Sequence, residues 1–548
     1  MDRNRDIPVS NINDLLDYAR DLYADLPAFS HRGTTLTYQQ LAELSEQFAA
    51  YLMGNHSIKA GDRLLILMPN VLQFPVVFFG ALRAGLVVVT ANPYSTSYEL
   101  EHQLKDSGAS VAVVLNSMSG ALASVIEKTA IHTLITTDAL DLHPFWRVLA
   151  AGLVNRRKFK MPKFSANLEQ VRFKQALALG KKTGAQPIKT SPDDVALLQY
   201  TGGTTGLSKG AVLLHRNLLA NMWQINDLLS EVIEEGKEII FASLPLYHIY
   251  SLTLHFLVIV SKGGQIVLIP DPRNLDSFVS ELGRYPFSIL GGVNTLFVSL
   301  CQHPGFQQLD FCHLKLTCSG GAPLTASTAG LWEQVTGKPI IEGYGLTEAA
   351  PVVTANSPDA GFTGTVGVPV RDTLIKVLSE EGTELSYGEA GELYVKGPQV
   401  MLGYWNSPVE TELALKQGWL ATGDIARFDQ HGNIQIVDRK KDMINVSGFT
   451  VYPSELEKVI SSHPQILECA AIGIPDENTG EVIKLFVVAS NPRLSIREIR
   501  DYCRERLTSY KVPRLVEFRE HLPHNAIGKV LRRQLRDAEL AAQIINRR

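Results

Sequence analysis

The sequence predicts an α/β protein with a large N-terminal domain of several subdomains and a small α+β C-terminal domain. Short apolar runs alternate with amphipathic helical stretches over most of the chain, the pattern becomes β-rich between Asp359 and Gly432, and it changes again after Asp438. Alternating βα units are typical of layered, mainly parallel sheets covered by helices. The 548 residues exceed the ~250–300 residues at which one hydrophobic core stops growing, so we expect more than one domain.

The N-terminal part opens with a helical signal at residues 37–54. Thr37 and Gln40 have capping-box spacing, and apolar residues then recur on one helical face up to Gly54. This pattern predicts an amphipathic helix. The strands of the sheet are predicted from apolar runs at residues 64–68, 86–90, 111–115 and 195–200.

The β-rich stretch consists of short runs separated by Gly pairs and Pro, which favours a small β-barrel-like subdomain. In the C-terminal part, Pro453 stands where a first helical turn would begin, and Ser495 and Glu498 have capping-box spacing before a second helix. Two apolar runs between them predict strands. We therefore expect domains of residues 1–438 and 439–548.

The composition excludes several classes of protein. The apolar fraction of 45% and charged fraction of 20% indicate a globular protein, and the net charge of −4 provides no basic field for nucleic acid. The five cysteines form no CxxC pair, which favours buried free thiols in a reducing cytosol over a disulfide or metal set. The N-terminus has no secretory signal, and no apolar run reaches the ~20 residues that a spanning helix needs. We expect a cytoplasmic protein.

A loop rich in Gly and Thr follows the apolar run that ends at Tyr200. Its glycines let backbone N–H groups approach an anion, its hydroxyls add donors, and Lys209 adds a positive charge. We expect a phosphate cradle between this strand and a following apolar helix. The spacing differs from the G-x-x-x-x-G-K-[ST] P-loop, which disfavours an ordinary mononucleotide-binding NTPase. The candidate phosphate-binding residues are Thr201, Gly202, Gly203, Thr204, Thr205, Gly206 and Lys209.

Other candidates have plainer interpretations on the residues alone. Residues 320–323 read as a simple turn, and Asp424 reads as the Asp of a Thr-Gly turn that bonds its own backbone. Arg439 reads as a surface ion pair, Lys529 as a surface lysine and His248 as a core histidine.

The loop sequence TGGTTGLSKGA resembles the phosphate loop of the adenylate-forming superfamily, which includes acyl-CoA synthetases, luciferase and peptide-synthetase adenylation domains. Further matches follow in order: residues 342–348 resemble the second nucleotide motif, residues 422–424 the third, residues 438–442 the hinge, and residues 525–529 the motif that carries the adenylation lysine.

This resemblance implies a nucleotide site. Glu348 and Thr204 would contact Mg²⁺, which prefers hard oxygen ligands. The ring of Tyr344 would stack on adenine against the bare backbone of Gly321, Ala322 and Pro323, and Asp424 would accept the ribose hydroxyls. The remaining residues of the second motif are Glu342, Gly343, Gly345 and Thr347.

The resemblance also implies a two-step reaction. Arg439 would hold ribose or phosphate, and Lys529 would bridge the attacking carboxylate and the α-phosphate. Lys441 would be the hinge about which the C-terminal domain swings between two half-reactions. Gly448 would line a pantetheine tunnel in the second, and His248 would contact the acyl group.

Over nearly its full length the chain resembles bacterial long-chain fatty-acid–CoA ligases, for example in the stretches LPLYHIY, VKGPQVMLGYW and DRKKDMINVSGFTVYPSELE. This implies that ATP activates a medium- or long-chain fatty acid to acyl-AMP, which coenzyme A then converts to acyl-CoA. One departure concerns the acyl gate: some members have a tryptophan shortly after the motif His, whereas Ile249, Tyr250, Ser251 and Leu252 follow His248. A fatty-acyl-AMP ligase and a non-catalytic acyl-binding protein are the alternatives.

Residues 143–163 combine apolar side chains with a basic cluster. Phe145 and Trp146 lie near Arg147, and further Arg and Lys residues follow. This composition suits either an anionic membrane surface or a solvated basic face. We expect a cytoplasmic enzyme, and the sequence leaves open both a peripheral contact with the inner face of the membrane and a homodimer.

Overall fold

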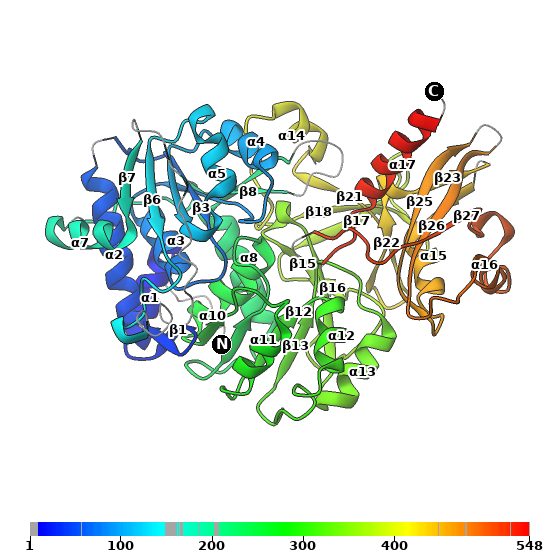
Figure 1. Cartoon of the computed structure of the whole chain (residues 1–548), viewed down its shortest axis with the longest axis horizontal. Coiled ribbons are helices and arrows are strands. Elements are labelled where there is room, and N and C mark those ends of the chain that lie inside the picture. Colours follow the sequence, from blue (N-terminus) through cyan, green and yellow to red (C-terminus); the bar gives the residue numbers. More distant parts are fainter. Residues whose placement is uncertain are drawn as a thin grey trace. The chain divides into compact units, whose positions relative to one another are not determined.

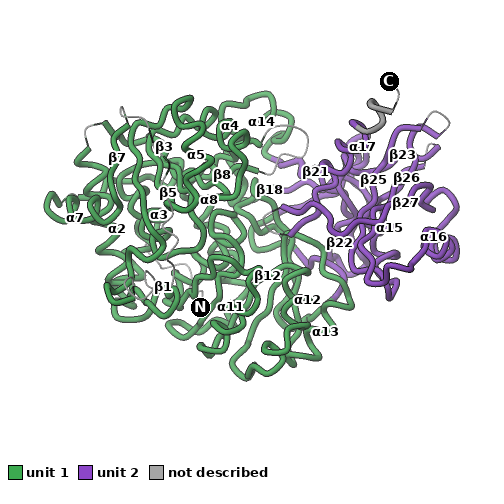
Figure 2. The backbone as a smooth tube through the Cα atoms, viewed as in Figure 1, with its two compact units in different colours: residues 1–362, 369–373, 396–418 green, residues 363–368, 374–395, 419–548 purple. Residues whose placement is uncertain are grey.

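The computed structural model describes residues 9–55, 57–147, 162, 164, 168–184, 186–201, 208–447, 449–476, 479–525 and 528–546. The chain forms two compact units (Figure 2). Unit 1 comprises residues 1–362, 369–373 and 396–418, and unit 2 comprises residues 363–368, 374–395 and 419–548. Unit 2 extends to both sides of Asp438, so the division into domains 1–438 and 439–548 stays a prediction.

The first sheet of unit 1 is mainly parallel, which confirms the expected βα pattern (Figure 1). Its order is β19-β9-β8-β4-β3-β5-β6-β7; neighbours from β8 to β7 are parallel, whereas β9 is antiparallel to β8 and β19. The predicted apolar runs become β3, β4, β5 and β8. The strands are β3 (Arg63–Leu67), β4 (Val87–Thr90), β5 (Val111–Leu115), β6 (Thr133–Thr137), β7 (Glu169–Arg172), β8 (Val195–Tyr200), β9 (Gly210–Leu214) and β19 (Gly403–Tyr404).

The helices around this sheet pack closely on one another. The predicted capping box of α2 is present, with Thr37 accepting from the Gln40 backbone and Gln40 reaching back to Thr37. A Cβ at Gly180 would lie 1.8 Å from the Gln47 carbonyl, so only glycine lets α7 approach α2 this closely. The helices are α2 (Tyr38–Gly54), α3 (Gln73–Arg83), α4 (Ser97–Ser107), α5 (Gly120–Val125), α7 (Phe173–Thr183), α8 (His215–Leu228) and α14 (Pro408–Ala414), with short 3₁₀ turns η1 (Asn116–Met118) and η2 (Ile126–Lys128).

The second sheet of unit 1 has the order β15-β14-β13-β12-β10-β11-β1-β2. Its strands are parallel from β14 to β1, and β15 and β2 are antiparallel to their neighbours. The strands are β1 (Pro27–His31), β2 (Thr34–Thr37), β10 (Ile239–Ala242), β11 (Gln265–Leu268), β12 (Ile289–Gly292), β13 (Leu316–Ser319), β14 (Ile340–Gly345) and β15 (Val352–Ala355). The helices are α1 (Ile12–Tyr23), α9 (Ile249–Ser251), the π-helix η3 (Leu252–Leu257), α10 (Val258–Ser261), α11 (Leu275–Leu282), α12 (Asn294–Gln302) and α13 (Ala326–Thr336).

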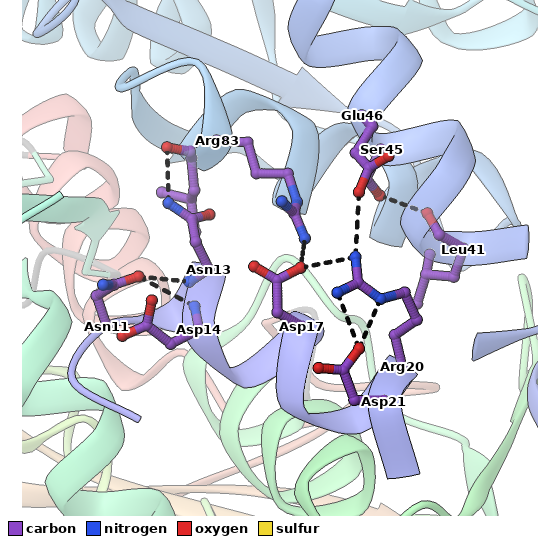
Figure 3. Close-up of polar contacts among 11 residues, drawn as sticks. Asn11, Asn13, Asp14, Asp17, Arg20, Asp21, Leu41, Ser45, Glu46 and Arg83 are labelled. Carbon is purple, nitrogen blue, oxygen red and sulfur yellow. Dashed lines mark hydrogen bonds and ion pairs between the residues drawn. The ribbon is translucent and has the colours of Figure 1, made fainter. Parts of the chain in front are cut away.

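A chain of charged side chains attaches α1 to α2 and α3 (Figure 3). The Asp17 carboxylate contacts both Arg83 and Arg20, and Arg20 also contacts Asp21 and Glu46. Arg83 is only 2% exposed, so Asp17 supplies the counter-charge that a buried guanidinium requires.

Unit 2 begins with the predicted β-rich region, which forms an antiparallel sheet. β18 and β22 each pair with β21, and β17 lies beside β18. The strands are β17 (Leu374–Leu378), β18 (Gly391–Lys396), β21 (Trp419–Phe428) and β22 (Ile434–Arg439). The 3₁₀ turn η5 (Lys440–Asp442) follows β22 directly, at the predicted hinge.

The C-terminal part of unit 2 is the predicted α+β arrangement. β26 lies between β25 and β23 and also pairs with β27, and β23 pairs with β24. Alternate residues of β25 pack against α15 and α16 on one face and α17 on the other. The elements are β23 (Ile444–Val446), β24 (Phe449–Val451), α15 (Pro453–Ile460), β25 (Ile466–Asp476), β26 (Gly480–Ala489), α16 (Ile496–Arg504), η6 (Ser509–Lys511), β27 (Leu515–Phe518) and α17 (Arg532–Asn546).

Both predicted C-terminal helix starts are confirmed. Pro453 opens α15, and Ser495 and Glu498 form a complete capping box on α16. All five cysteines are free thiols as predicted, although Cys312 is exposed rather than buried. Within the described ranges, no helix is both long and apolar enough to span a membrane.

Candidate functional site

The predicted phosphate loop joins two neighbouring strands. Residues 202–207 lie outside the described residues, so the phosphate contacts predicted for Gly202, Gly203, Thr204, Thr205 and Gly206, and the Thr204–metal contact, stay predictions. The ends of the loop are close together, because the Thr201 N–H donates to the Lys209 carbonyl at 3.0 Å.

A strand that was not predicted separates this loop from the expected apolar helix. Residues 210–214 form β9, because their backbone pairs with β8 on one side and β19 on the other, and α8 begins only at His215. The loop therefore connects two antiparallel strands, and none of the described residues directly after it begins a helix.

Lys209 and Glu348 both contact one aromatic side chain, Tyr404. The Tyr404 hydroxyl donates to Glu348 Oε1 at 2.6 Å, and the Lys209 ammonium lies 4.7 Å from the centre of the Tyr404 ring. Lys209 Nζ also lies 2.6 Å from Glu410 Oε2. The structure thus brings the predicted phosphate-binding lysine and the predicted metal-binding carboxylate together within unit 1.

Main-chain pairing fixes the position of Tyr404. β19 pairs with β9 so that Tyr404 lies opposite Ala211, two residues after Lys209. The Met401 N–H also donates to the carbonyl of Glu348 at 2.8 Å. Burial and the nearby Glu348 carboxylate raise the pKa of Tyr404, so its hydroxyl stays a hydrogen-bond donor.

The second nucleotide motif lies at the carboxyl end of two parallel strands. Glu342, Gly343, Tyr344 and Gly345 end β14, and Thr347 and Glu348 lie in the 3₁₀ turn η4 (Thr347–Ala349). The predicted turn with Gly321, Ala322 and Pro323 follows β13, whose Ser319 pairs with Glu342.

The Glu342 carboxylate holds this turn in place, because its Oε1 accepts the Leu324 N–H at 3.1 Å. Gly321 has a φ of +78°, which favours glycine. The structure therefore places the proposed adenine platform beside the strand that carries Tyr344, and Tyr344 itself is half-buried.

His248 caps the short helix α9 and leads into the π-helix η3. Its Nδ1 accepts the Tyr250 N–H at 3.3 Å, and burial lowers the pKa of His248 to about 4, so the imidazole is neutral at pH 7. The Tyr250 hydroxyl donates to the Cys318 carbonyl at 3.4 Å, and a Cβ at Gly320 would lie 3.2 Å from the Tyr250 ring. The segment that carries His248 therefore packs against the turn after β13.

In unit 2, Asp424 and Arg439 form a cross-strand ion pair. Arg439 Nε lies 3.1 Å from Asp424 Oδ1, and the two residues are register partners in β21 and β22. Thr422, Gly423 and Asp424 lie within β21 rather than in a separate turn. The register with β18 shifts at these residues and Gly423 has a φ of +70°, while Asp424 pairs with Arg439 of β22.

Lys529 and Lys441 lie within electrostatic range of this pair. Burial, followed by the positive charge of Arg439, lowers the pKa of each lysine to about 8. The charge of Lys529 also disfavours that of Lys441, whereas Asp424 and Asp442 favour both. Unit 2 thus collects the predicted ribose, phosphate, hinge and adenylation residues, while Gly448 lies outside the described residues.

The donor set for a metal is sparse. Among the described residues, no group of three or more His, Cys, Asp or Glu side chains is arranged to hold a metal ion. Mg²⁺ is commonly held by one or two carboxylates together with substrate phosphates, so the single Glu348 carboxylate fits Mg²⁺ that arrives with a nucleotide.

Sequence reasoning missed Tyr404, Glu410 and Arg532 as members of these groups. Tyr404 meets Glu348 from 56 residues away, and no local spacing signals that contact. Arg532 contacts the Glu457 carboxylate of unit 2 from 75 residues away, which no local spacing signals either.

Comparisons with known proteins identify the family of the chain. A family model described as AMP-binding enzyme matches residues 16–405, and one described as AMP-binding enzyme C-terminal domain matches residues 455–529. The chain is 46% identical over 526 residues to a long-chain-fatty-acid–CoA ligase of Escherichia coli O157:H7, covering 96% of this chain and 94% of that protein.

Two solved structures are similar over nearly the whole chain. The anthranilate CoA ligase AuaEII in complex with anthranoyl-AMP has a TM-score of 0.85 at 26% identity and is matched over 98% of this chain and 99% of that one. ATP-bound MatB from Rhodopseudomonas palustris has a TM-score of 0.81 at 27% identity, over 96% of this chain and 99% of that one. The family model over residues 16–405 and the 46% identity over 96% of the chain show that this protein belongs to the AMP-binding enzymes.

Proposed function

We propose that this protein is an AMP-forming fatty-acid–CoA ligase that activates medium- or long-chain fatty acids. The observation that carries the proposal is the 46% identity over 96% of the chain to a protein named as a long-chain-fatty-acid–CoA ligase. The charge cluster in unit 2 supports it, because Arg439, Lys441 and Lys529 form a cationic group suited to phosphate and carboxylate.

In the first half-reaction, a fatty-acid carboxylate oxygen attacks the α-phosphorus of ATP, and the bond to pyrophosphate breaks. The Lys529 ammonium holds the two anions together and stabilises the charge that builds on the phosphorus. Asp424 accepts the ribose hydroxyls, and Arg439, paired with Asp424, orients this carboxylate. Glu348 would hold Mg²⁺, which would neutralise phosphate charge.

In the second half-reaction, the thiolate of coenzyme A attacks the acyl carbonyl and AMP leaves. We propose that the chain rotates at Lys441 between the two steps, so that one site serves both. The acyl group would lie near His248, whose neutral imidazole adds no charge beside an apolar chain.

The function is tested by supplying ATP, Mg²⁺ and saturated acids of increasing length, with and without coenzyme A. We expect pyrophosphate release with fatty acids, and release of free AMP with formation of acyl-CoA only when coenzyme A is present. Acyl-AMP that transfers to a carrier protein but not to coenzyme A would favour a fatty-acyl-AMP ligase. No pyrophosphate with any acid would contradict the proposal and favour an acyl-binding protein.

Replacing Lys529 by alanine should separate the half-reactions. We expect Lys529→Ala to slow adenylation by about 10²–10³-fold, because a preorganised cation is lost from the transition state. Thioester formation from synthetic acyl-AMP and coenzyme A should persist. Lys458→Ala, which removes an exposed lysine of unit 2, is the matched control. Equal losses in both half-reactions would refute this role for Lys529.

The pH dependence follows from the same lysine. The folded chain holds the pKa of Lys529 at about 8, below its ordinary value, and the reaction uses the protonated form. Adenylation kcat/KM for ATP should therefore be highest below pH 8 and fall as the pH rises through about 8. Lys441→Ala removes a neighbouring like charge and should move this decline to higher pH. An unchanged profile would show that another group controls it.

We also propose that the enzyme contacts anionic membrane surfaces through Phe145 and Trp146, which are 75% and 63% exposed. His143 fixes this segment by hydrogen bonds to Thr34 at 2.7 Å and His31 at 3.0 Å. The Arg147 guanidinium lies 4.9 Å from the centre of the Trp146 ring, which places a positive charge beside the aromatic side chains.

Cosedimentation with phosphatidylglycerol vesicles tests this contact. Phe145→Ser/Trp146→Ser should lower the bound fraction about tenfold or more, because each buried aromatic contributes about 1.5–3 kcal/mol. Tyr387→Ser, at a 70% exposed site, is the control. Equal binding by the Phe145→Ser/Trp146→Ser double variant and the Tyr387→Ser control would contradict the proposal.

A homodimer stays a prediction, which the light-scattering mass of the purified chain would test.

A further inference from the structure

Arg532 connects several segments of unit 2. It opens α17, three residues after Lys529, and its side chain is 14% exposed. Its Nε lies 3.0 Å from Glu457 Oε1, and its Nη2 lies 3.1 Å from Ser454 Oγ, both in α15. Its Nη1 faces Asp438 Oδ1 at 3.6 Å and Asp442 Oδ2 at 3.5 Å. One guanidinium thus contacts the residues on both sides of Lys441.

Asp438 is the member of this group that lies before the proposed hinge. Its side chain is fully buried, and Oδ1 accepts the Arg439 N–H at 2.7 Å while Oδ2 accepts the Ser454 N–H at 2.6 Å. A carboxylate at the start of a helix is favoured by the helix dipole. Asp438 therefore joins the chain before Lys441 to α15 and Arg532 after it.

Arg532 is also coupled to Lys529 through a short, hydrogen-bonded turn. The Lys529 N–H donates to Asn525 Oδ1 at 2.8 Å, and the Asn525 N–H donates to the Lys529 carbonyl at 2.9 Å. The Leu531 N–H then donates to the Pro523 carbonyl at 2.8 Å. Since these bonds restrain the backbone between Lys529 and Arg532, fixing the guanidinium also fixes the lysine.

We propose that Arg532 is a positioning residue for adenylation: by engaging Asp438 across the hinge, it holds Lys529 beside Asp424 and Arg439. The inference rests on the proposed function, in which Lys529 serves the first half-reaction and Lys441 is the pivot. Rotation at Lys441 separates Asp438 from Ser454 and Arg532, whereas Glu457 and Asp442 move with Arg532. The Asp438 contact therefore stabilises only the adenylating arrangement.

A purely structural role makes a different prediction. If Arg532 only attached α17 to α15 through Glu457 and Ser454, its loss would weaken the C-terminal fold and impair both half-reactions together. Measuring the two half-reactions separately distinguishes the positioning role from the structural one. A substitution at Asp438 adds a second test, because it leaves the contact between Arg532 and Glu457 intact.

The experiment compares Arg532→Gln, Arg532→Lys and Asp438→Asn in the full chain. Arg504→Gln, which removes an exposed arginine charge from α16, is the matched control. ATP–pyrophosphate exchange measures adenylation, thioester formation from synthetic acyl-AMP measures the second step, and thermal unfolding monitors the fold. We expect Arg532→Gln to reduce exchange about tenfold or more, since a charged partner of a buried carboxylate is lost. Thioester formation should change less than about twofold, because that arrangement lacks the contact.

Two further variants test whether the Asp438 contact and the charge at position 532 account for the loss of exchange. Asp438→Asn should reduce exchange less than Arg532→Gln, because the amide oxygen still accepts a hydrogen bond, and Arg532→Lys should restore part of the rate as a point charge. Unchanged exchange in Asp438→Asn, or equal loss of both half-reactions in the folded variants, would overturn the inference. If Arg532→Gln does not fold, Asp438→Asn decides alone. A wild-type chain without any exchange would refute the proposed function itself.

Discussion

The proposed chemistry of unit 2 depends on three positive side chains that lie close together and are at most partly exposed: Arg439, Lys441 and Lys529. Burial lowers the pKa of Lys441 and Lys529 to about 8, and the positive charge of Arg439 adds to this effect. Carboxylates make the arrangement possible: Asp424 pairs with Arg439 across two strands, and Asp442 acts on both lysines. The lysines nevertheless remain under-compensated. Anionic phosphate and carboxylate groups would relieve this repulsion, so the local electrostatics of the fold favour the binding of such substrates.

In unit 1, the predicted phosphate-binding lysine and metal-binding carboxylate already have partners within the protein. Tyr404 donates to Glu348, and Lys209 pairs with Glu410 and lies over the Tyr404 ring. A nucleotide would therefore exchange these contacts for new ones, and only the difference between the two sets would contribute to its affinity. The hairpin of β8 and β9 and the pairing of β19 keep these side chains in place before any ligand arrives.

Local signals in the sequence predicted the elements whose stability is local. The capping boxes at Thr37 and Ser495 and the proline at the start of α15 depend on residues within one helical turn, and all three are present. The strand of residues 210–214 was not predicted, because an apolar run this short has no period that separates a buried strand from a helix. Asp424 was placed in a turn because the Thr-Gly pair before it is typical of turns, whereas its pairing with Arg439 of β22 keeps it in a strand whose register with β18 shifts at this point. The contacts of Tyr404 and Arg532 join distant segments, so no spacing could reveal them.

The side chain at position 532 differs from its lysine neighbours because it does not titrate in the pH range in which Lys441 and Lys529 do. A guanidinium stays protonated at every pH at which proteins fold, whereas the ammonium groups of Lys441 and Lys529 titrate near pH 8. The contacts of Arg532 with Glu457, Asp438 and Asp442 therefore persist while the lysines lose their protons. In a mildly alkaline solution the turn before α17 would keep its place and only the charge on its lysine would vanish. The unit thus places a non-titrating anchor next to a titrating reactive group, and the positive charge of this anchor also helps to hold the pKa of Lys529 low.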